Sequence, residues 1–293
     1  MVKIIEKKVI GKNVTHMTID APYIAKKALA GQFIILRVDK EGERIPLTIF
    51  KANKNEGTVE IIYQVVGATT MKLDLKEKGD FIEDIVGPLG KATEVKGYKK
   101  VIVVSGGVGS AIAYPLAKAF KENGSKIEIV VGFRNKDYII LEDEMKLIDE
   151  NIEIVTDDGS NGKKALVTAS LEEKLKKYSN YDLVVAVGPI PMMKAVCDIT
   201  KRYNVKTIVS MTAIMIDGTG MCGGCRLTVG GKVKFACIDG PDFDGHLVDF
   251  EEASFRSKTF LDEEKISREK NCNLFKGVWI MINKSKIKNP MPV

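Results

Sequence analysis

Short, almost wholly apolar runs between residues 99 and 212 constrain the fold more than any other feature. The runs read VIVVSG, KIEIVVG, NIEIVTDD, YDLVVAVG and TIVSM, and they alternate with helical patterns such as SAIAYPLAKAFKENG and PMMKAVCDITKRY. Strands this apolar are typical of a parallel sheet that helices cover on both faces. We therefore expect a doubly wound α/β domain over residues 97–212.

The sequence before this domain shows a different residue pattern. Residues 1–96 contain short strand patterns separated by turn signals, among them NVTHMTID, GQFIILRV, RIPLTIF and TVEIIYQVV. Only APYIAKKALAG and TTMKLDLKEKG could hold a helical turn or two, and each ends in glycine. This spacing predicts a small antiparallel β-barrel.

The chain after residue 212 is predicted to form two smaller parts. Residues 213–250 hold glycine-rich turns and too few apolar residues to form a core of their own, so we expect a bound metal to stabilise them. Residues 251–293 are expected to form a charged helix and a tail, which includes the unassigned Cys272. Cys197 lies on an apolar helix face and is expected in the core.

Composition and charge exclude several classes of protein. The 293 residues carry a net charge of +6. Acidic and basic residues are mixed along the chain and do not form blocks of like charge, so neither nucleic-acid nor membrane-surface binding is expected. The N-terminus lacks a signal-peptide pattern, and no run of about 18 apolar residues could span a bilayer. We expect a cytoplasmic protein, in which clustered cysteines indicate metal rather than disulfides.

A glycine-rich loop follows the first apolar strand of the α/β domain. Gly106, Gly107 and Gly109 stand directly before a helix, where backbone N–H groups and the helix dipole favour a phosphate. The pattern is G-G-x-G and lacks the full dinucleotide fingerprint, so a simple tight turn is the alternative.

Further loops are expected at the same carboxyl edge of the sheet, where ligands of open α/β sheets bind. Arg134 follows the second strand and is either a ribose or phosphate contact or a solvated arginine. Met192 and Met193 could line the site, although methionines there are more often core residues. The remaining candidates at this edge are Asp157, Gly159, Gly188 and Pro189. Together these loops predict a nucleotide site.

Three cysteines lie within sixteen residues in the glycine-rich segment. Cys222 and Cys225 are two residues apart, and Cys237 follows after eleven more. Plant-type [2Fe-2S] sites place another ligand five residues before the first of these, and that position is Asp217. We therefore expect a [2Fe-2S] cluster held by these four residues. A structural zinc ion and reduced cysteines in a turn are the alternatives.

The order of RIPLT, IYQVVGATT, SGGVGS, VGPIPMM and DGTGMCGGC resembles a known family. It is similar to the ferredoxin-reductase-type electron-transfer subunits of dihydroorotate dehydrogenase, and more similar to the small subunits of NADH-dependent reduced ferredoxin:NADP oxidoreductase. The resemblance covers about residues 1–255. Asp217 favours the second group, because the dihydroorotate dehydrogenase subunits carry cysteine at that position.

The resemblance implies FAD on the barrel. The segment matching Pro46, Leu47 and Thr48 would contact the isoalloxazine ring. The ribityl and phosphate contacts would map to Ile62, Tyr63, Gln64, Thr69 and Thr70. Gly67 is a further candidate, because the segment from Gly67 to Thr70 offers hydroxyls and backbone N–H groups at an expected helix start. Relatives place an arginine where this chain has Ile45, with Arg44 one position earlier. In a strand that shift points Arg44 to the opposite face unless a bulge corrects it.

The implied function is electron transfer without a classical catalytic residue. Hydride would pass between NAD(H) and FAD, and the cluster would relay single electrons to a larger FAD- and [4Fe-4S]-containing subunit in a heterodimer, reaching ferredoxin indirectly. This describes an oxidoreductase subunit, and the resemblance implies flavin-based electron bifurcation between NADH, ferredoxin and NADP. The alternatives are a dihydroorotate dehydrogenase electron-transfer subunit, a sulfide dehydrogenase component, or a zinc-stapled nucleotide-binding regulatory module without redox turnover.

Overall fold

The computed structural model describes residues 1–269. Its N-terminal part is an antiparallel sheet of strand order β6-β1-β2-β5-β4-β3-β7. Glu83 alone separates β6 from β7, so the two edges of the sheet lie together and the barrel is nearly closed. The elements are β1 (Val2–Gly11), β2 (Val14–Asp20), α1 (Pro22–Lys27), β3 (Phe33–Arg37), β4 (Arg44–Asn53), β5 (Thr58–Gln64), α2 (Ala68–Asp74), β6 (Phe81–Ile82) and β7 (Asp84–Leu89).

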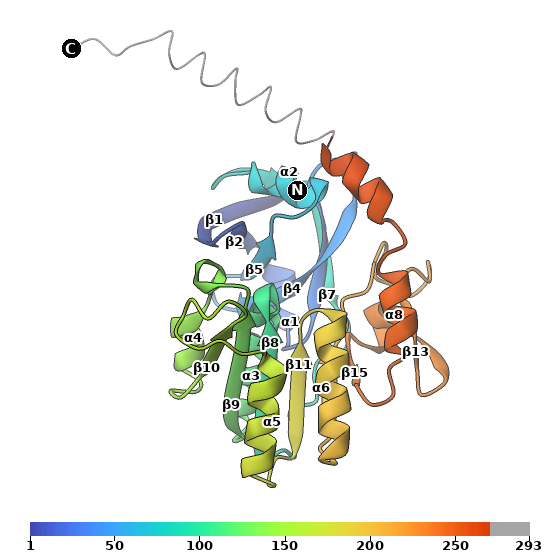
Figure 1. Ribbon diagram of the computed structural model, residues 1–293. Helices are drawn as coiled ribbons and strands as arrows, with labels where there is room; N and C mark the ends of the chain where they lie inside the picture. Colours follow the sequence, from blue (N-terminus) through green and yellow to red (C-terminus); the bar gives the residue numbers. More distant parts are fainter. Residues whose placement is uncertain (270–293) are drawn as a thin grey trace, which may run out of the picture.

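Below the barrel in Figure 1 lies the predicted α/β domain. Its sheet has the order β10-β9-β8-β11-β12-β15, and the first five strands are parallel. The elements are β8 (Lys100–Gly106), α3 (Ser110–Glu122), β9 (Lys126–Phe133), α4 (Glu142–Lys146), β10 (Glu153–Thr156), α5 (Val167–Lys177), β11 (Leu183–Val187), α6 (Ile190–Arg202) and β12 (Thr207–Ser210). The predicted fold class, a barrel followed by a doubly wound domain, is confirmed.

Burial on both faces explains the apolar runs of this sheet. In β8, Val101 and Val103 pack with α3 on one face, whereas Ile102 and Val104 pack with α5 and α6 on the other. Every second residue is therefore withdrawn from water on each side, and no polar face remains along the strand. Strands of this kind stabilise the domain through their buried apolar area.

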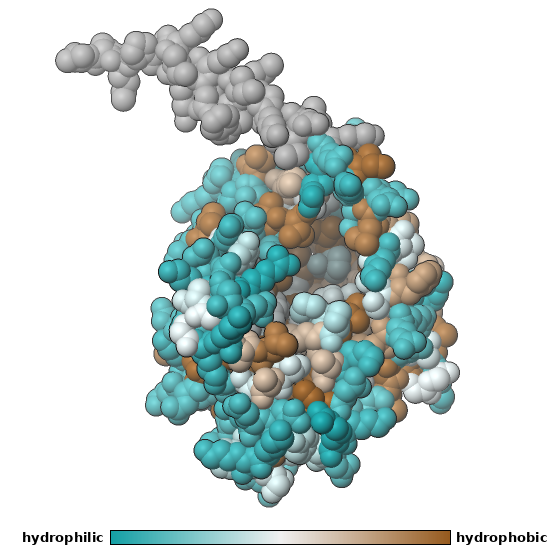
Figure 2. All heavy atoms as spheres, viewed as in Figure 1, coloured by the Kyte–Doolittle hydropathy of each residue, from teal (hydrophilic) through white to brown (hydrophobic). Residues whose placement is uncertain are grey.

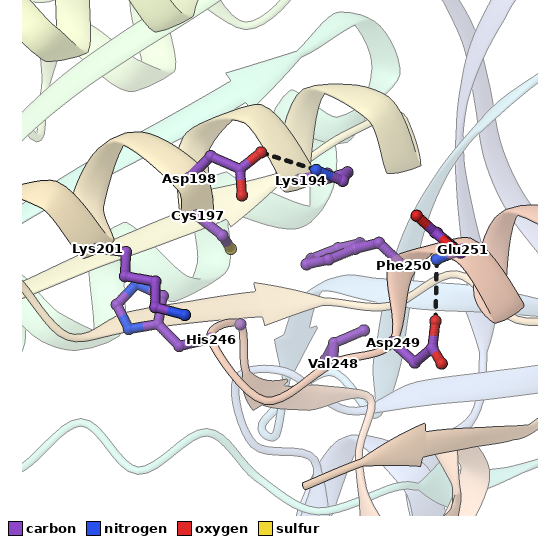
Figure 3. Close-up of a pocket in the computed structure, with 10 residues that line it drawn as sticks. Lys194, Cys197, Asp198, Lys201, His246, Val248, Asp249, Phe250 and Glu251 are labelled. Carbon is purple, nitrogen blue, oxygen red and sulfur yellow. Dashed lines mark hydrogen bonds and ion pairs between the residues drawn. The ribbon is translucent and has the colours of Figure 1, made fainter. Parts of the chain in front are cut away.

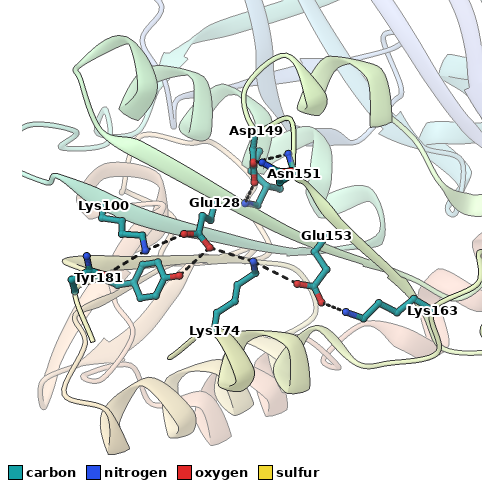
Figure 4. Close-up of polar contacts among 10 residues, drawn as sticks. Lys100, Glu128, Asp149, Asn151, Glu153, Lys163, Lys174 and Tyr181 are labelled. Atoms are coloured by element: carbon teal, nitrogen blue, oxygen red, sulfur yellow. Dashed lines mark hydrogen bonds and ion pairs between the residues drawn. The ribbon is translucent and has the colours of Figure 1, made fainter. Parts of the chain in front are cut away.

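A charged network ties the sheet to α5 near the start of the strands (Figure 4). Glu128 of β9 receives hydrogen bonds from Lys174 and from the Tyr181 hydroxyl, at 3.2 and 2.9 Å. Lys100 lies 3.1 Å from the same carboxylate. Burial alone would raise the pKa of Glu128, but the hydrogen bonds from these partners outweigh it and hold that pKa below its ordinary value.

The cysteine-containing segment is joined to the edge of the α/β sheet. It forms the hairpin β13 (Arg226–Val229) and β14 (Lys232–Phe235), the short helix α7 (Ala236–Asp239), and β15 (Asp242–Asp244), which pairs antiparallel with β12. The helix α8 (Phe250–Arg256) follows, and residues 261–269 are also helical. The rest of the predicted tail, with Cys272, lies outside the described residues. No helix within residues 1–269 is long and apolar enough to cross a membrane.

Candidate functional site

The glycine-rich loop lies between β8 and α3, as predicted. Gly107 has a φ of +57°, and an added Cβ would meet nothing within 4 Å, so the space in front of this backbone is open. At Gly109, in contrast, a Cβ would lie 2.8 Å from the Val187 carbonyl oxygen. One glycine therefore leaves room for a ligand, and the other lets α3 start close against β11.

The loops at the carboxyl edge of the sheet come together as predicted. In the parallel ladders, Gly106 pairs with Gly132, Thr156 with Phe133, and Val187 with Ser105, so the strand ends are level. Figure 2 shows this face hollowed between the barrel and the α/β domain. The four loops that follow β8, β9, β10 and β11 thus meet at one edge.

Methionine and glycine pack together at this edge. A Cβ on Gly106 would lie 2.8 Å from the Met192 sulfur, and one on Gly188 would lie 2.7 Å from the Met192 methyl group. Both glycines are therefore needed for the side chain to lie against the loop. Met193, by comparison, is fully buried in the core. Pro189 occupies the position directly before α6.

Arg134 and Asp157 face solvent beside this loop. Among the described residues, Arg134 has no hydrogen bond or ion pair, so its guanidinium is available to a ligand. The Asp157 amide donates to the Phe133 carbonyl oxygen at 3.0 Å, which fixes the loop after β10. Gly159, at a φ of +79°, provides the turn that follows.

Strand β4 presents two different faces. Ile45 and Leu47 pack into the barrel core, whereas Phe50 packs against Tyr114 of α3, with ring centroids 4.9 Å apart. The β3 to β4 pairing is regular from Arg44 to Thr48, without a bulge. By alternation, Arg44, Pro46 and Thr48 all lie on the face that looks toward the α/β domain.

The β3 to β4 register shows on which face of β4 Arg44 lies. It does point away from the Ile45 face, but the opposite face is the one that carries Pro46 and Thr48. Its Nε is buried and has no hydrogen-bond partner among the described residues. A buried guanidinium nitrogen without an acceptor is costly and fits an anionic ligand at this place.

The β5 candidates divide between the two faces in the same way. Ile62 packs toward the α/β domain, and Gln64 shares its face, whereas Tyr63 is 2% exposed inside the barrel. The Tyr63 hydroxyl donates to Asp74 at 3.3 Å, and burial raises the pKa of the phenol. Of Tyr63, only the backbone is therefore available to a ligand.

The start of α2 is held by its own threonines. The Thr70 hydroxyl accepts hydrogen bonds from the backbone N–H groups of Val66 and Gly67, at 3.1 and 3.0 Å. The Thr69 hydroxyl donates to Glu43 at 3.2 Å, a partner that the sequence did not predict. A Cβ on Gly67 would meet nothing within 4 Å, so open space lies in front of this turn.

The four predicted metal ligands form two pairs. The sulfur atoms of Cys225 and Cys237 lie 3.2 Å apart, and both side chains are buried. Asp217 accepts hydrogen bonds from the backbone N–H groups of Thr219 and Cys222, at 2.9 and 3.0 Å. Within residues 1–269, no three His, Cys, Asp or Glu side chains converge as ligands of a single ion. Two pairs of donors suit the two irons of a [2Fe-2S] cluster better than one tetrahedral ion.

The chemistry of these donors also fits a cationic group. Burial and the neighbouring Cys225 raise the pKa of the Cys237 thiol to about 12, so a bound cation is needed to make it a thiolate at neutral pH. The backbone hydrogen bond from Thr219, with that from Cys222, holds the pKa of Asp217 below its ordinary value. The carboxylate is thus ionised and oriented before a metal binds.

The loop that carries Asp217 is pressed against the barrel. A Cβ on Gly218 would lie 2.6 Å from Cδ1 of Ile35 and 2.7 Å from Cδ1 of Leu89. Ile35 is the cross-strand partner of Pro46. The predicted cluster loop and the predicted flavin face are therefore neighbours. Phe33, Ile34, Ile35 and Leu36 are all apolar and all buried, so the sequence does not show on which face of β3 Ile35 lies or what covers it.

A separate, smaller hollow of about 270 Å³ lies between α6 and the segment after β15 (Figure 3). Cys197, Lys201, His246 and Phe250 line it. Cys197 belongs to the core, as expected, and burial raises the pKa of its thiol to about 12. This thiol stays protonated, and the hollow includes none of the predicted site residues.

Comparison with known proteins agrees with this arrangement. Residues 103–198 match the oxidoreductase NAD-binding domain, and residues 212–249 match the iron-sulfur cluster binding domain of dihydroorotate dehydrogenase B. The predicted oxidoreductase class and the NAD(H) and iron-sulfur cofactors are confirmed by these matches. The predicted FAD agrees with the ferredoxin-reductase-like fold: phthalate dioxygenase reductase has a TM-score of 0.59 at 19% identity, covering 84% of this chain and 76% of that one.

Two similar proteins cover almost the whole chain. The "dihydroorotate dehydrogenase B (NAD(+)), electron transfer subunit homolog" of Thermotoga maritima is 46% identical over 92% of this chain and 94% of that protein. A chain from the structure of the NADH-dependent reduced ferredoxin-NADP oxidoreductase is 44% identical, with a TM-score of 0.87, over 92% of this chain and 97% of that one. The electron transfer subunit of Clostridium perfringens is 34% identical over 76% of this chain and 88% of that protein. These similarities, together with the fold and the paired donors, show that the chain belongs to the family of dihydroorotate dehydrogenase B electron-transfer subunits and their homologues.

Proposed function

We propose that this chain exchanges hydride between NAD(H) and FAD and relays single electrons through a [2Fe-2S] cluster to a larger partner subunit. FAD, when bound, supplies the conversion between hydride transfer and single-electron transfer. The chain itself holds the groups in place and adjusts their potentials. No side chain is assigned as an acid, base or nucleophile.

The nucleotide would bind at the carboxyl edge of the α/β sheet. The open backbone at Gly107 can approach a phosphate, and the start of α3 favours its charge. Met192 packs on Gly106 and Gly188 and gives the edge an apolar wall. Arg134, Asp157, Gly159 and Pro189 would complete the site from the neighbouring loops.

FAD would lie on the face of the barrel that looks toward this edge. Pro46 and Thr48 would contact the isoalloxazine, and Leu47 would contribute its backbone because its side chain is inside the barrel. Arg44 would pair with the pyrophosphate, since its buried Nε has no acceptor. Ile62, Gln64 and the backbone of Tyr63 would line the same face, with Gly67, Thr69 and Thr70 at the start of α2.

The cluster would be held by both donor pairs, with Asp217 and Cys222 on one iron and Cys225 and Cys237 on the other. A carboxylate is a harder donor than a thiolate and changes the potential of the iron that it binds. The backbone N–H groups that orient Asp217 would tune that effect further.

The contact of Gly218 with Ile35 carries the proposal. Gly218 directly follows the predicted ligand Asp217, and it contacts β3 at Ile35. Ile35 pairs with Pro46, the predicted flavin contact. Phe50, on the same face of β4, is buried against α3 of the nucleotide domain. These contacts support a cluster loop next to the flavin face, with β4 joined to α3, the helix that follows the glycine-rich loop.

The surface around the cluster loop has the character of an interface with a partner subunit. Met221 is 88% exposed, Ile216 54% and Ile238 44%, and all three lie within or beside the ligand segment. Exposed apolar groups gathered in this way are typical of a protein interface. We assign the partner as a larger FAD- and [4Fe-4S]-containing subunit, with ferredoxin reached through it.

Electron bifurcation between NADH, ferredoxin and NADP is the function favoured here, because a similar structure belongs to an enzyme of that kind. The second candidate is electron transfer for a dihydroorotate dehydrogenase, as in the name of the Thermotoga maritima homologue. Association with either a bifurcating flavoprotein subunit or a dihydroorotate-oxidising subunit separates the two.

The test uses the full chain, purified and reconstituted without oxygen. Wild type should bind FAD and iron with sulfide, and should reduce ferricyanide with NADH. Asp217→Ala and Cys237→Ala should lose iron, Asp217→Cys should keep it with an altered absorption spectrum, and Cys197→Ala should match wild type. A wild-type protein that binds zinc but neither flavin nor iron would overturn the proposal.

A further inference from the structure

A groove of about 790 Å³ runs between the barrel and the C-terminal half of α3. It is lined by the end of β4, the segment after α1, the linker between the two domains, and α3. None of its lining residues belongs to the cysteine-containing segment. The groove is therefore separate from the apolar surface around the cluster loop.

The rim of this groove is basic. Lys51, Lys54 and Lys96 line it, and among residues 1–269 none of them has a carboxylate within 4 Å. Lys118 also lines the rim and has a distant ion pair of 3.7 Å with Glu122. The other acidic residue in the lining, Glu60, is already bonded to His16 at 2.8 Å. The free charge of the groove is thus positive.

Its floor is small and apolar. Alanine side chains at 28, 30, 52, 92 and 119 line the groove together with Val95 and Pro115. Leu29 stands at the edge and is 57% exposed. The four lysines come from the end of β4, the linker and α3. An apolar centre with a polar rim is typical of protein docking surfaces.

We propose that this groove docks an acidic segment of a partner protein, one that carries an apolar side chain beside its carboxylates. The apolar side chain packs on Leu29 and the alanine floor, and the carboxylates pair with the rim lysines. Charge complementarity of this kind increases the association rate and selects the partner. Because the rim spans the barrel, the linker and α3, the partner contacts both domains at once.

The experiment measures binding of a short fluorescein-labelled peptide of alternating glutamate and leucine to the full chain, by fluorescence anisotropy at low and high salt. Lys51→Gln, Lys54→Gln, Lys96→Gln and Lys118→Gln are combined in one variant. The matched control combines Lys3→Gln, Lys8→Gln, Lys78→Gln and Lys232→Gln, exposed lysines outside the groove. A third variant, Leu29→Asp, tests the apolar contact.

The groove variant should bind the peptide about tenfold more weakly, and the control should stay within about twofold of wild type. Binding by wild type should weaken as salt increases, and Leu29→Asp should weaken it at every salt concentration. Equal losses in both lysine variants would overturn the proposal, because they would indicate general attraction by the net charge. Absence of peptide binding would overturn it too. Displacement of the peptide by one equivalent of ATP would also overturn it, because that result would indicate a site for a small anion rather than a protein docking surface.

Discussion

Replacing Gly218 with alanine tests the contact between the cluster loop and the barrel. Gly218 has a φ of +77°, and its added Cβ would lie 2.6 Å from Ile35 and 2.7 Å from Leu89. The left-handed backbone costs about 1–2 kcal/mol for alanine, and overpacking costs about 1–3 kcal/mol. The free energy of unfolding should therefore fall by about 2–5 kcal/mol.

The control for this variant is Gly231→Ala in the same segment. Gly231 has a φ of +73°, but a Cβ there would meet nothing within 4 Å. Its cost should be the backbone part alone, about 1–2 kcal/mol. Urea unfolding followed by circular dichroism gives both values, and hydrogen exchange of β13 and β14 shows whether the loss is local. Equal losses in the two variants would refute the proposed packing of Gly218 on the barrel.

Three further outcomes are expected. Gly107→Val should weaken NADH binding at least about tenfold in a titration, because its side chain fills the open phosphate space, whereas Gly124→Val, also left-handed and unobstructed, should not. Met221→Asp should weaken association with the larger subunit about tenfold in calorimetry at unchanged iron content, whereas Leu147→Asp, on a residue of the α/β domain that is 78% exposed, should have no effect. Glu128 has a pKa below its ordinary 4.5, so its contribution is complete above that pH and lost as the pH falls through the lowered value. Glu128→Gln should lower the urea midpoint at pH 7 more than at pH 4, and an equal shift at both would contradict the ion-pair account.

Much of the architecture follows from local patterns. The apolar runs predicted the parallel sheet, because strands buried on both faces cannot carry a polar side. The glycine loop at Gly106 and Gly107 could be placed at a strand-to-helix junction from its neighbours alone. The spacing of Cys222, Cys225 and Asp217 pointed to iron because ligand spacing in these sites is local.

The sequence by itself therefore determined the two domain types, the strand ends at which a nucleotide would bind, and the identity of the candidate ligands. Only the tertiary structure decided which faces meet. It placed Arg44 on the side of Pro46, paired Cys225 with Cys237, added β15 to the sheet, and set Gly218 on Ile35. Strand alternation gives two faces without saying which neighbour covers each, and packing between residues far apart in the chain depends on shape that no local pattern encodes.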